Sequence, residues 1–181
     1  HAHPLSPPPP SRRPLAFGLQ LTNKRSNSRS PRRLEPVNFS GEWRLNHERS
    51  EDESEMLKAL GVPWAARVAL AGASRTVVIE HDGIEWNETI KTSLFTKSTS
   101  YLLDGENRKE VSPADRAVIM IAQAFEDSSR QVILQRTSYP DGDPRSLVVR
   151  KSIIDGGCTY YVQTTLTIQG GLVLTTKKYF D

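Results

Sequence analysis

The sequence predicts an all-β domain, a ten-stranded antiparallel up-and-down barrel with a helix–turn–helix pair after the first strand. Two observations carry this prediction. From residue 75 onward, short segments rich in β-branched and aromatic residues alternate with turn signals made of Gly, Asp, Ser and Pro, which is the pattern of consecutive strands. One stretch near the start has helical periodicity, and a regular meander of strands favours a closed barrel because closure removes its edges.

The first strand is predicted over Phe39–Leu45, where Phe39, Gly41, Trp43 and Leu45 alternate with polar residues and share one face. Such alternation is typical of a half-buried strand. A glycine inside a strand often marks a bend or a close approach to the backbone. We therefore expect one of these two features at Gly41.

A helix pair is predicted between the first and second strands. Ser50 and Glu53 have the spacing of a capping box, and acidic residues crowd the first turn, where the helix dipole favours negative charge. Gly61 is a C-terminal stop, and Pro63 can begin a second helix that reaches Gly72. The acidic first helix argues against a DNA-binding helix–turn–helix.

The remaining strands are separated by turn signals such as His81-Asp82-Gly83 and Gly170-Gly171. They are predicted at 75–80, 84–92, 94–103, 107–112, 116–125, 130–137, 145–153, 158–168 and 172–180. Together with the first strand they make about ten strands.

Residues 1–37 differ in composition and are predicted to form a basic tail outside the barrel, which spans residues 38–181. Residues 1–34 contain seven of the 24 basic side chains and none of the 21 acidic ones. The run Pro7–Pro10 favours polyproline II, and the rest of the tail cannot build a core. Three interpretations remain open: a disordered linker, a segment that targets an organelle such as a plastid or mitochondrion, and an arm that binds a protein partner.

Charge and motifs argue against several function classes. Without its tail the chain is mildly acidic, so it lacks the basic surface of a nucleic-acid-binding domain. Cys158 is the only cysteine, so no internal disulfide can form, which suits a reducing, intracellular compartment. No apolar run approaches the ~18 residues of a transmembrane segment. Catalytic motifs and histidines at metal-binding spacing are absent from the sequence, which predicts a protein that is not an enzyme and has no cofactor.

Four short stretches resemble the intracellular fatty-acid-binding protein family, which includes the cellular retinoid-binding proteins and belongs to the calycin superfamily. "FSGEW" resembles the opening strand of that family, and "EMLKALGVPWAARVALAG" resembles its helix pair. "IIDGG" resembles a late hairpin turn, and "TTKKYF" resembles the last strand, where the family has Arg-x-Tyr. The resemblance covers about residues 38–181.

This resemblance implies a barrel that holds a fatty acid or similar lipophilic molecule under a helical lid. It implies that Lys177 and Tyr179, with Arg150, bind the ligand carboxylate inside the barrel. The lid residues would be Met56, Leu57, Leu60, Val62 and Val68. Lys177 departs from the family's arginine and offers a point charge in place of a two-pronged donor. The segment from Arg150 to Tyr179 is also longer than usual for the family.

Two function classes therefore remain open. The first is a non-enzymatic lipid carrier, for which ten strands enclose more volume than side chains need to fill. The second is a structural subunit of a larger, organellar or membrane-associated assembly, with the barrel as scaffold and the basic tail as anchor.

Overall fold

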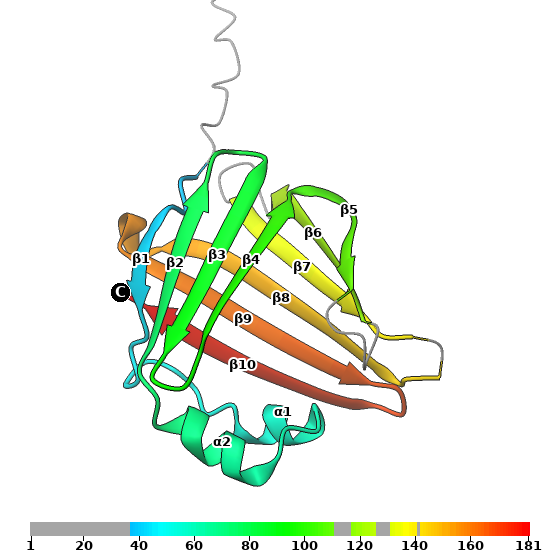
Figure 1. Cartoon of the computed structure of the whole chain (residues 1–181). Coiled ribbons are helices and arrows are strands. Elements are labelled where there is room, and N and C mark those ends of the chain that lie inside the picture. The colour runs from blue at the N-terminus through cyan, green and yellow to red at the C-terminus, as the bar shows by residue number, and fades with distance from the viewer. Residues whose placement is uncertain (1–36, 111–116, 126–130, 141) are drawn as a thin grey trace, which may run out of the picture. The chain divides into compact units, whose positions relative to one another are not determined.

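The computed structural model describes residues 37–110, 117–125, 131–140 and 142–181, all within one compact unit, Leu34–Asp181. This part of the chain contains two short α-helices, one 3-10 turn (Asp155–Gly157) and ten strands (Figure 1). The helices are α1 (Ser54–Ala59) and α2 (Trp64–Ala71). The strands are β1 (Gly41–Arg44), β2 (Arg75–His81), β3 (Glu85–Thr92), β4 (Thr96–Leu102), β5 (Asp104–Glu110), β6 (Val118–Phe125), β7 (Gln131–Ser138), β8 (Arg145–Ile154), β9 (Thr159–Ile168) and β10 (Leu172–Phe180).

The strands form two antiparallel sheets in sequence order, β1-β2-β3-β4 and β10-β9-β8-β7-β6-β5. The first and last strands join the two sheets, because Arg44 and Asp181 exchange backbone hydrogen bonds of 2.8 and 2.9 Å and Leu45 forms a bridge with Phe180. The predicted fold class is therefore confirmed, with ten antiparallel strands and a helix pair after the first.

The ladder is interrupted between β4 and β5, which do not pair in the described part of the chain. Only Leu103 separates the end of β4 from the start of β5. A hairpin needs at least two loop residues, so the chain crosses from one sheet to the other here. The predicted strand at 94–103 is correspondingly shorter, and the next strand begins at Asp104 rather than at 107. Residues 111–112, 116 and 130, which were also predicted as strand, lie outside the described residues.

The first helix begins later than the capping box predicts. The Ser50 hydroxyl accepts a hydrogen bond from the backbone N–H of Tyr179 (3.0 Å), and the Glu53 carboxylate pairs with Arg75 (2.6 Å). Neither side chain caps α1, which starts at Ser54. Both potential capping groups therefore contact β2 or β10 and not the start of α1. The predicted stop at Gly61 has a positive φ of 82°.

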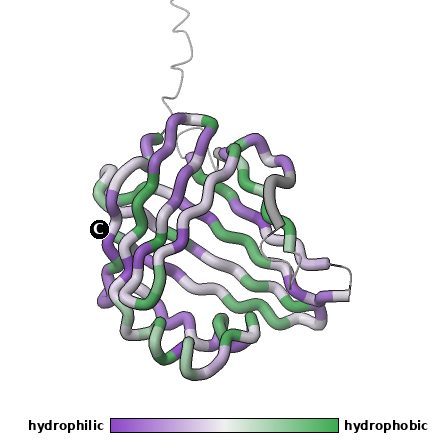
Figure 2. The backbone as a smooth tube through the Cα atoms, viewed as in Figure 1, coloured by the Kyte–Doolittle hydropathy of each residue, from purple (hydrophilic) through white to green (hydrophobic). Residues whose placement is uncertain are grey.

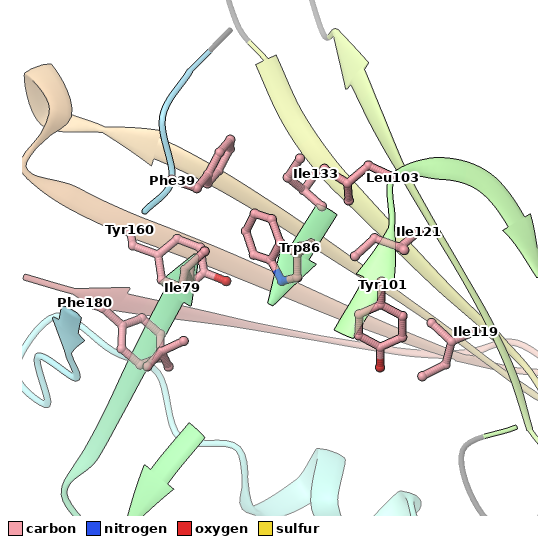
Figure 3. Packing of buried hydrophobic residues seen from close by; sticks show 11 residues of the cluster. Phe39, Ile79, Trp86, Tyr101, Leu103, Ile119, Ile121, Ile133, Tyr160 and Phe180 are labelled. Carbon is pink, nitrogen blue, oxygen red and sulfur yellow. The ribbon is translucent and has the colours of Figure 1, made fainter. Parts of the chain in front are cut away.

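Side chains from both sheets meet in one buried cluster (Figure 3). The Phe39 and Trp86 rings meet edge to face with centroids 5.4 Å apart, and Tyr160 and Phe180 of the opposite sheet pack 5.5 Å apart. The cluster contains Phe39, Val77, Ile79, Trp86, Tyr101, Leu103, Ile119, Ile121, Ile133, Tyr160 and Phe180. Because side chains alternate along a strand, these residues fix which face of β2, β3, β4, β6, β7, β9 and β10 points inward. Figure 2 shows the corresponding mixture of hydrophobic and hydrophilic residues along the strands.

Gly41 allows a close approach, as the sequence predicts. The Trp43 indole N–H donates to the Phe39 carbonyl oxygen (3.1 Å), which holds the ring over the backbone of β1. A Cβ atom at position 41 would lie 3.3 Å from that ring. The glycine therefore leaves room for the indole, which packs against Tyr160 with centroids 5.9 Å apart.

Candidate functional site

The candidate site is the inner face of the barrel beyond the buried cluster, toward the end beneath α1 and α2 (Figure 1). Several apolar residues face inward there: Ile90 opposes Val77, and Leu174 opposes the fully buried Leu166. Val149 and Val162 share the inward faces of β8 and β9 with Lys151 and Tyr160. All four apolar side chains (Ile90, Val149, Val162 and Leu174) are nevertheless only half-buried, so solvent reaches the interior at this end.

The helices cover this end unequally. Met56 of α1 is buried, and its sulfur lies 3.7 Å from the Thr176 hydroxyl of β10. In contrast, α2 has no buried residue. The predicted lid residues Leu57, Leu60 and Val62 are half-buried. Val68, which was also predicted as a lid residue, lies on α2 with 54% of its surface exposed.

Ion pairs attach the lid to the barrel at its mouth. Glu53, just before α1, lies 2.6 Å from Arg75 of β2 and 3.6 Å from Lys178 of β10. The Lys178 ammonium also donates to the Glu51 backbone carbonyl (2.8 Å). The side chains of Glu53, Arg75 and Lys178 are each less than a fifth exposed. A pocket of about 270 Å³ lies beside them, between the segment before α1 and the end of α2, and includes Leu70 and Lys178 in its lining.

A second ion pair lies deeper in the barrel, between Glu88 of β3 and Lys151 of β8, and we call it the inner pair. The Lys151 ammonium donates to Glu88 Oε2, and only 8% of Glu88 and 4% of Lys151 are exposed. The Trp86 indole N–H donates to the same oxygen (3.2 Å), and the ammonium lies 5.0 Å from the centroid of the Trp86 ring. The strands β3 and β8 belong to different sheets, so the inner pair links the two walls of the barrel.

Two tyrosines lie close enough to Glu88 to be affected by its charge. Burial, with the Glu88 carboxylate as a further cause, raises the pKa of Tyr160 well above 10. Burial also raises the pKa of Tyr101, and Glu88 adds to that shift, although a hydrogen bond with Thr99 opposes it. The Tyr160 hydroxyl is buried and has no hydrogen-bond partner among the described residues. Both phenols are therefore neutral at physiological pH.

The predicted ligand-binding residues lie on the opposite face of the sheet from this interior. Phe180 and Thr176 of β10 are buried, so alternation places Lys177 and Tyr179 on the outside. The Lys177 ammonium is half exposed and 3.8 Å from Glu51. The Arg49 guanidinium stacks on the Tyr179 ring at 4.6 Å from its centroid.

Arg150 shares the outer face, because its neighbour Lys151 points inward to Glu88 of the opposite sheet and side chains alternate along a strand. Arg150 and Tyr179 line the same surface pocket of about 270 Å³, together with Tyr161 and Gln163. The predicted position of all three residues inside the barrel is therefore wrong. Both β8 and β10 contain two consecutive basic residues, Arg150–Lys151 and Lys177–Lys178. In each strand the second of the two points inward.

The sequence analysis missed the inner pair. Its carboxylate is visible as Trp86-x-Glu88, an alternation that places an acidic residue on the same face as a large aromatic one. That alternation indicates an inward carboxylate once the tryptophan is known to be buried. Its partner is 63 residues away, and no sequence pattern links the two.

Neither metal ligation nor a membrane-spanning helix is found in the described residues. They contain no group of three or more His, Cys, Asp or Glu side chains that could hold a metal ion. Neither of their helices is long and apolar enough to cross a membrane.

Comparison with known proteins gives matches among solved structures. No family model matches the chain, and no curated protein sequence does. Lipid binding protein 8 of Caenorhabditis elegans has a TM-score of 0.60 at 20% identity, over 82% of this chain and 97% of that one. The fatty acid-binding protein from the brain of Drosophila melanogaster has a TM-score of 0.56 at 23% identity, over 80% of this chain and 99% of that one. Human cRBP IV has a TM-score of 0.58 at 18% identity, over 81% of this chain and 98% of that one. These likenesses confirm that the chain has the fold of the fatty-acid-binding proteins, as its sequence motifs predict.

Proposed function

We propose that this chain is a non-enzymatic lipid carrier that binds a lipophilic molecule inside the barrel, beneath α1 and α2. The observation that carries the proposal is the partly exposed apolar surface of inward residues such as Ile90, Val149 and Leu174. Apolar surface of this kind gains free energy when it is covered, by about 0.8 kcal/mol for each methylene group buried. An acyl chain or a similar hydrocarbon is the matching ligand.

The structural neighbours support the same class of ligand. One is called a lipid binding protein and another a fatty acid-binding protein. Identities of 20% and 23% establish the fold alone, so the identity of the ligand must come from the residues of this chain.

The proposal is tested by titrating the delipidated full-length chain with a fluorescent fatty acid. Two neighbouring valines on β8 give a matched pair of variants, because Val149 faces inward with Lys151 and Val148 faces outward with Arg150. Val149→Trp places a large ring in the volume that the ligand needs, and we expect at least a tenfold loss of affinity. Val148→Trp adds the same ring to the outer face, and we expect unchanged affinity. Absence of saturable binding by a folded wild-type chain would contradict the proposal, and equal losses in both variants would contradict the interior site.

The alternative function, a scaffold subunit held by its tail, depends on residues 1–34, which lie outside the described residues. Attachment to a partner and an organelle address therefore stay predictions. Deletion of residues 1–34 followed by a pull-down distinguishes them, because an anchor is needed to recover partners and a removable address is not.

A further inference from the structure

On the basis of the proposed lipid-carrier function, we propose that the interior prefers a neutral lipid with a hydroxyl head group, such as a long-chain alcohol, over an ionised fatty acid. The juxtaposition that carries this proposal is the inner pair of Glu88 and Lys151, which places a carboxylate of the protein itself on the deep cation of the barrel.

The buried cations that the structure describes in the interior have carboxylate partners. Lys151 pairs with Glu88, and both Arg75 and Lys178 lie beside Glu53. A fatty-acid carboxylate gains from a buried site only where a buried cation is available to it. Lys97 shares the inner face of β4 with Tyr101, but it is exposed at the rim near the β3–β4 turn, where water weakens such a pairing.

Displacement of Glu88 by a ligand carboxylate is costly. Glu88 would then stay buried with only the Trp86 indole N–H as its described side-chain partner. An unpaired buried charge is strongly unfavourable, and the ligand charge would lie next to that of Glu88. The influence of Glu88 on the neutral phenols Tyr101 and Tyr160 indicates that its negative charge is felt in this part of the interior.

A hydroxyl head group fits the same surroundings without such a cost. Both side-chain bonds described for Glu88 fall on Oε2, which leaves Oε1 as an acceptor for a ligand O–H. A hydroxyl can also accept a hydrogen bond. Neutral polar residues also lie on this inner face: Thr99 on β4, Gln135 and Thr137 on β7, and Thr164 on β9.

The test compares two ligands with the same hydrocarbon chain, oleyl alcohol and oleic acid, at neutral pH. Each displaces a fluorescent lipid probe from the delipidated full-length chain, at concentrations below those at which the ligands aggregate. We expect the alcohol to bind at least tenfold more tightly, which corresponds to about 1.4 kcal/mol. Equal affinity, or tighter binding of the acid, would overturn the preference and leave the carrier function standing. Failure of both ligands to displace a bound probe would overturn the interior site and the preference with it, and failure of the probe itself to bind would overturn the carrier function.

Variants assign the preference to the inner pair. Glu88→Gln keeps the shape of the side chain and leaves Lys151 without a carboxylate, so the ratio of affinities should move toward the acid by at least about tenfold. Glu80→Gln removes the same charge from an exposed position on β2, and the ratio should not change. If Glu88→Gln does not fold, the double variant Glu88→Gln with Lys151→Met supplies a neutral pair of similar size. It should retain the preference for the alcohol, and a preference for the acid there would overturn the role of the inner pair.

Discussion

Replacement of Lys151 by methionine tests the inner pair as an element of stability. Methionine keeps most of the aliphatic length of lysine and removes the ammonium that donates to Glu88. The carboxylate, only 8% exposed, then keeps the Trp86 indole N–H as its one described side-chain partner. Removal of one member of a buried ion pair typically costs about 3–5 kcal/mol, because the other charge stays buried without compensation. This is a large part of the roughly 5–15 kcal/mol that stabilises a typical domain.

Two further variants separate the charge effect from the loss of packing. Lys151→Met with Glu88→Gln replaces the pair by neutral groups of similar volume, and we expect it to recover most of the lost stability, since such replacements are often neutral. Lys177→Met is the matched control on the outer face, where its ammonium lies 3.8 Å from Glu51 and is half exposed. Exposed pairs contribute about 0–1 kcal/mol.

The measurement is urea-induced unfolding followed by tryptophan fluorescence, with thermal unfolding as a second probe. For a domain of this size a loss of about 3–5 kcal/mol lowers Tm by roughly 6–20 °C. If Lys151→Met costs no more than Lys177→Met, the inner pair is not a buried, compensated pair and the reasoning fails. The same conclusion follows if the double variant is as unstable as the single one.

Three other perturbations have outcomes fixed by local geometry. Burial lowers the pKa of His81, although the charge of Asp82 opposes this shift to a smaller extent. Folding therefore favours the neutral imidazole. The free energy of unfolding should be highest above the unfolded pKa of about 6.5 and should fall as the pH drops below that value. Urea midpoints at several pH values should show this loss in the wild type, and the loss should be smaller in His81→Phe. Tyr160→Phe removes a buried hydroxyl without a described partner and should change the free energy of unfolding by less than about 1 kcal/mol; a larger loss in chemical denaturation would reveal a partner. Gly41→Ala adds a methyl group 3.3 Å from an indole ring and should lower the free energy of unfolding by about 1–3 kcal/mol. Gly72→Ala, with open space around it, should lie within about 1 kcal/mol of the wild type. Equal effects of the two variants would argue against the close approach at Gly41.

The sequence by itself determined the class and order of the elements, because the signals for them are local. Turn residues such as Gly83 and Gly171 have positive φ values of 99° and 109°, and they separate β2 from β3 and β9 from β10 where the sequence predicts. Gly61 likewise has a positive φ of 82° and follows the end of α1 and its C-cap residue Leu60. Local signals were insufficient where a distant segment competes for the same groups. Ser50 therefore contacts β10 and does not cap α1.

Only the tertiary structure decided which residues line the interior. Two strands contain consecutive basic residues, Arg150–Lys151 and Lys177–Lys178, and alternation requires that one of each pair faces inward without saying which. The choice follows from packing: burial of Tyr160 and Phe180 between the sheets turns Lys151 and Lys178 inward. The partner of Lys151 is then fixed by which strand faces β8 across the barrel, a relation between segments 63 residues apart that no local pattern in the chain specifies.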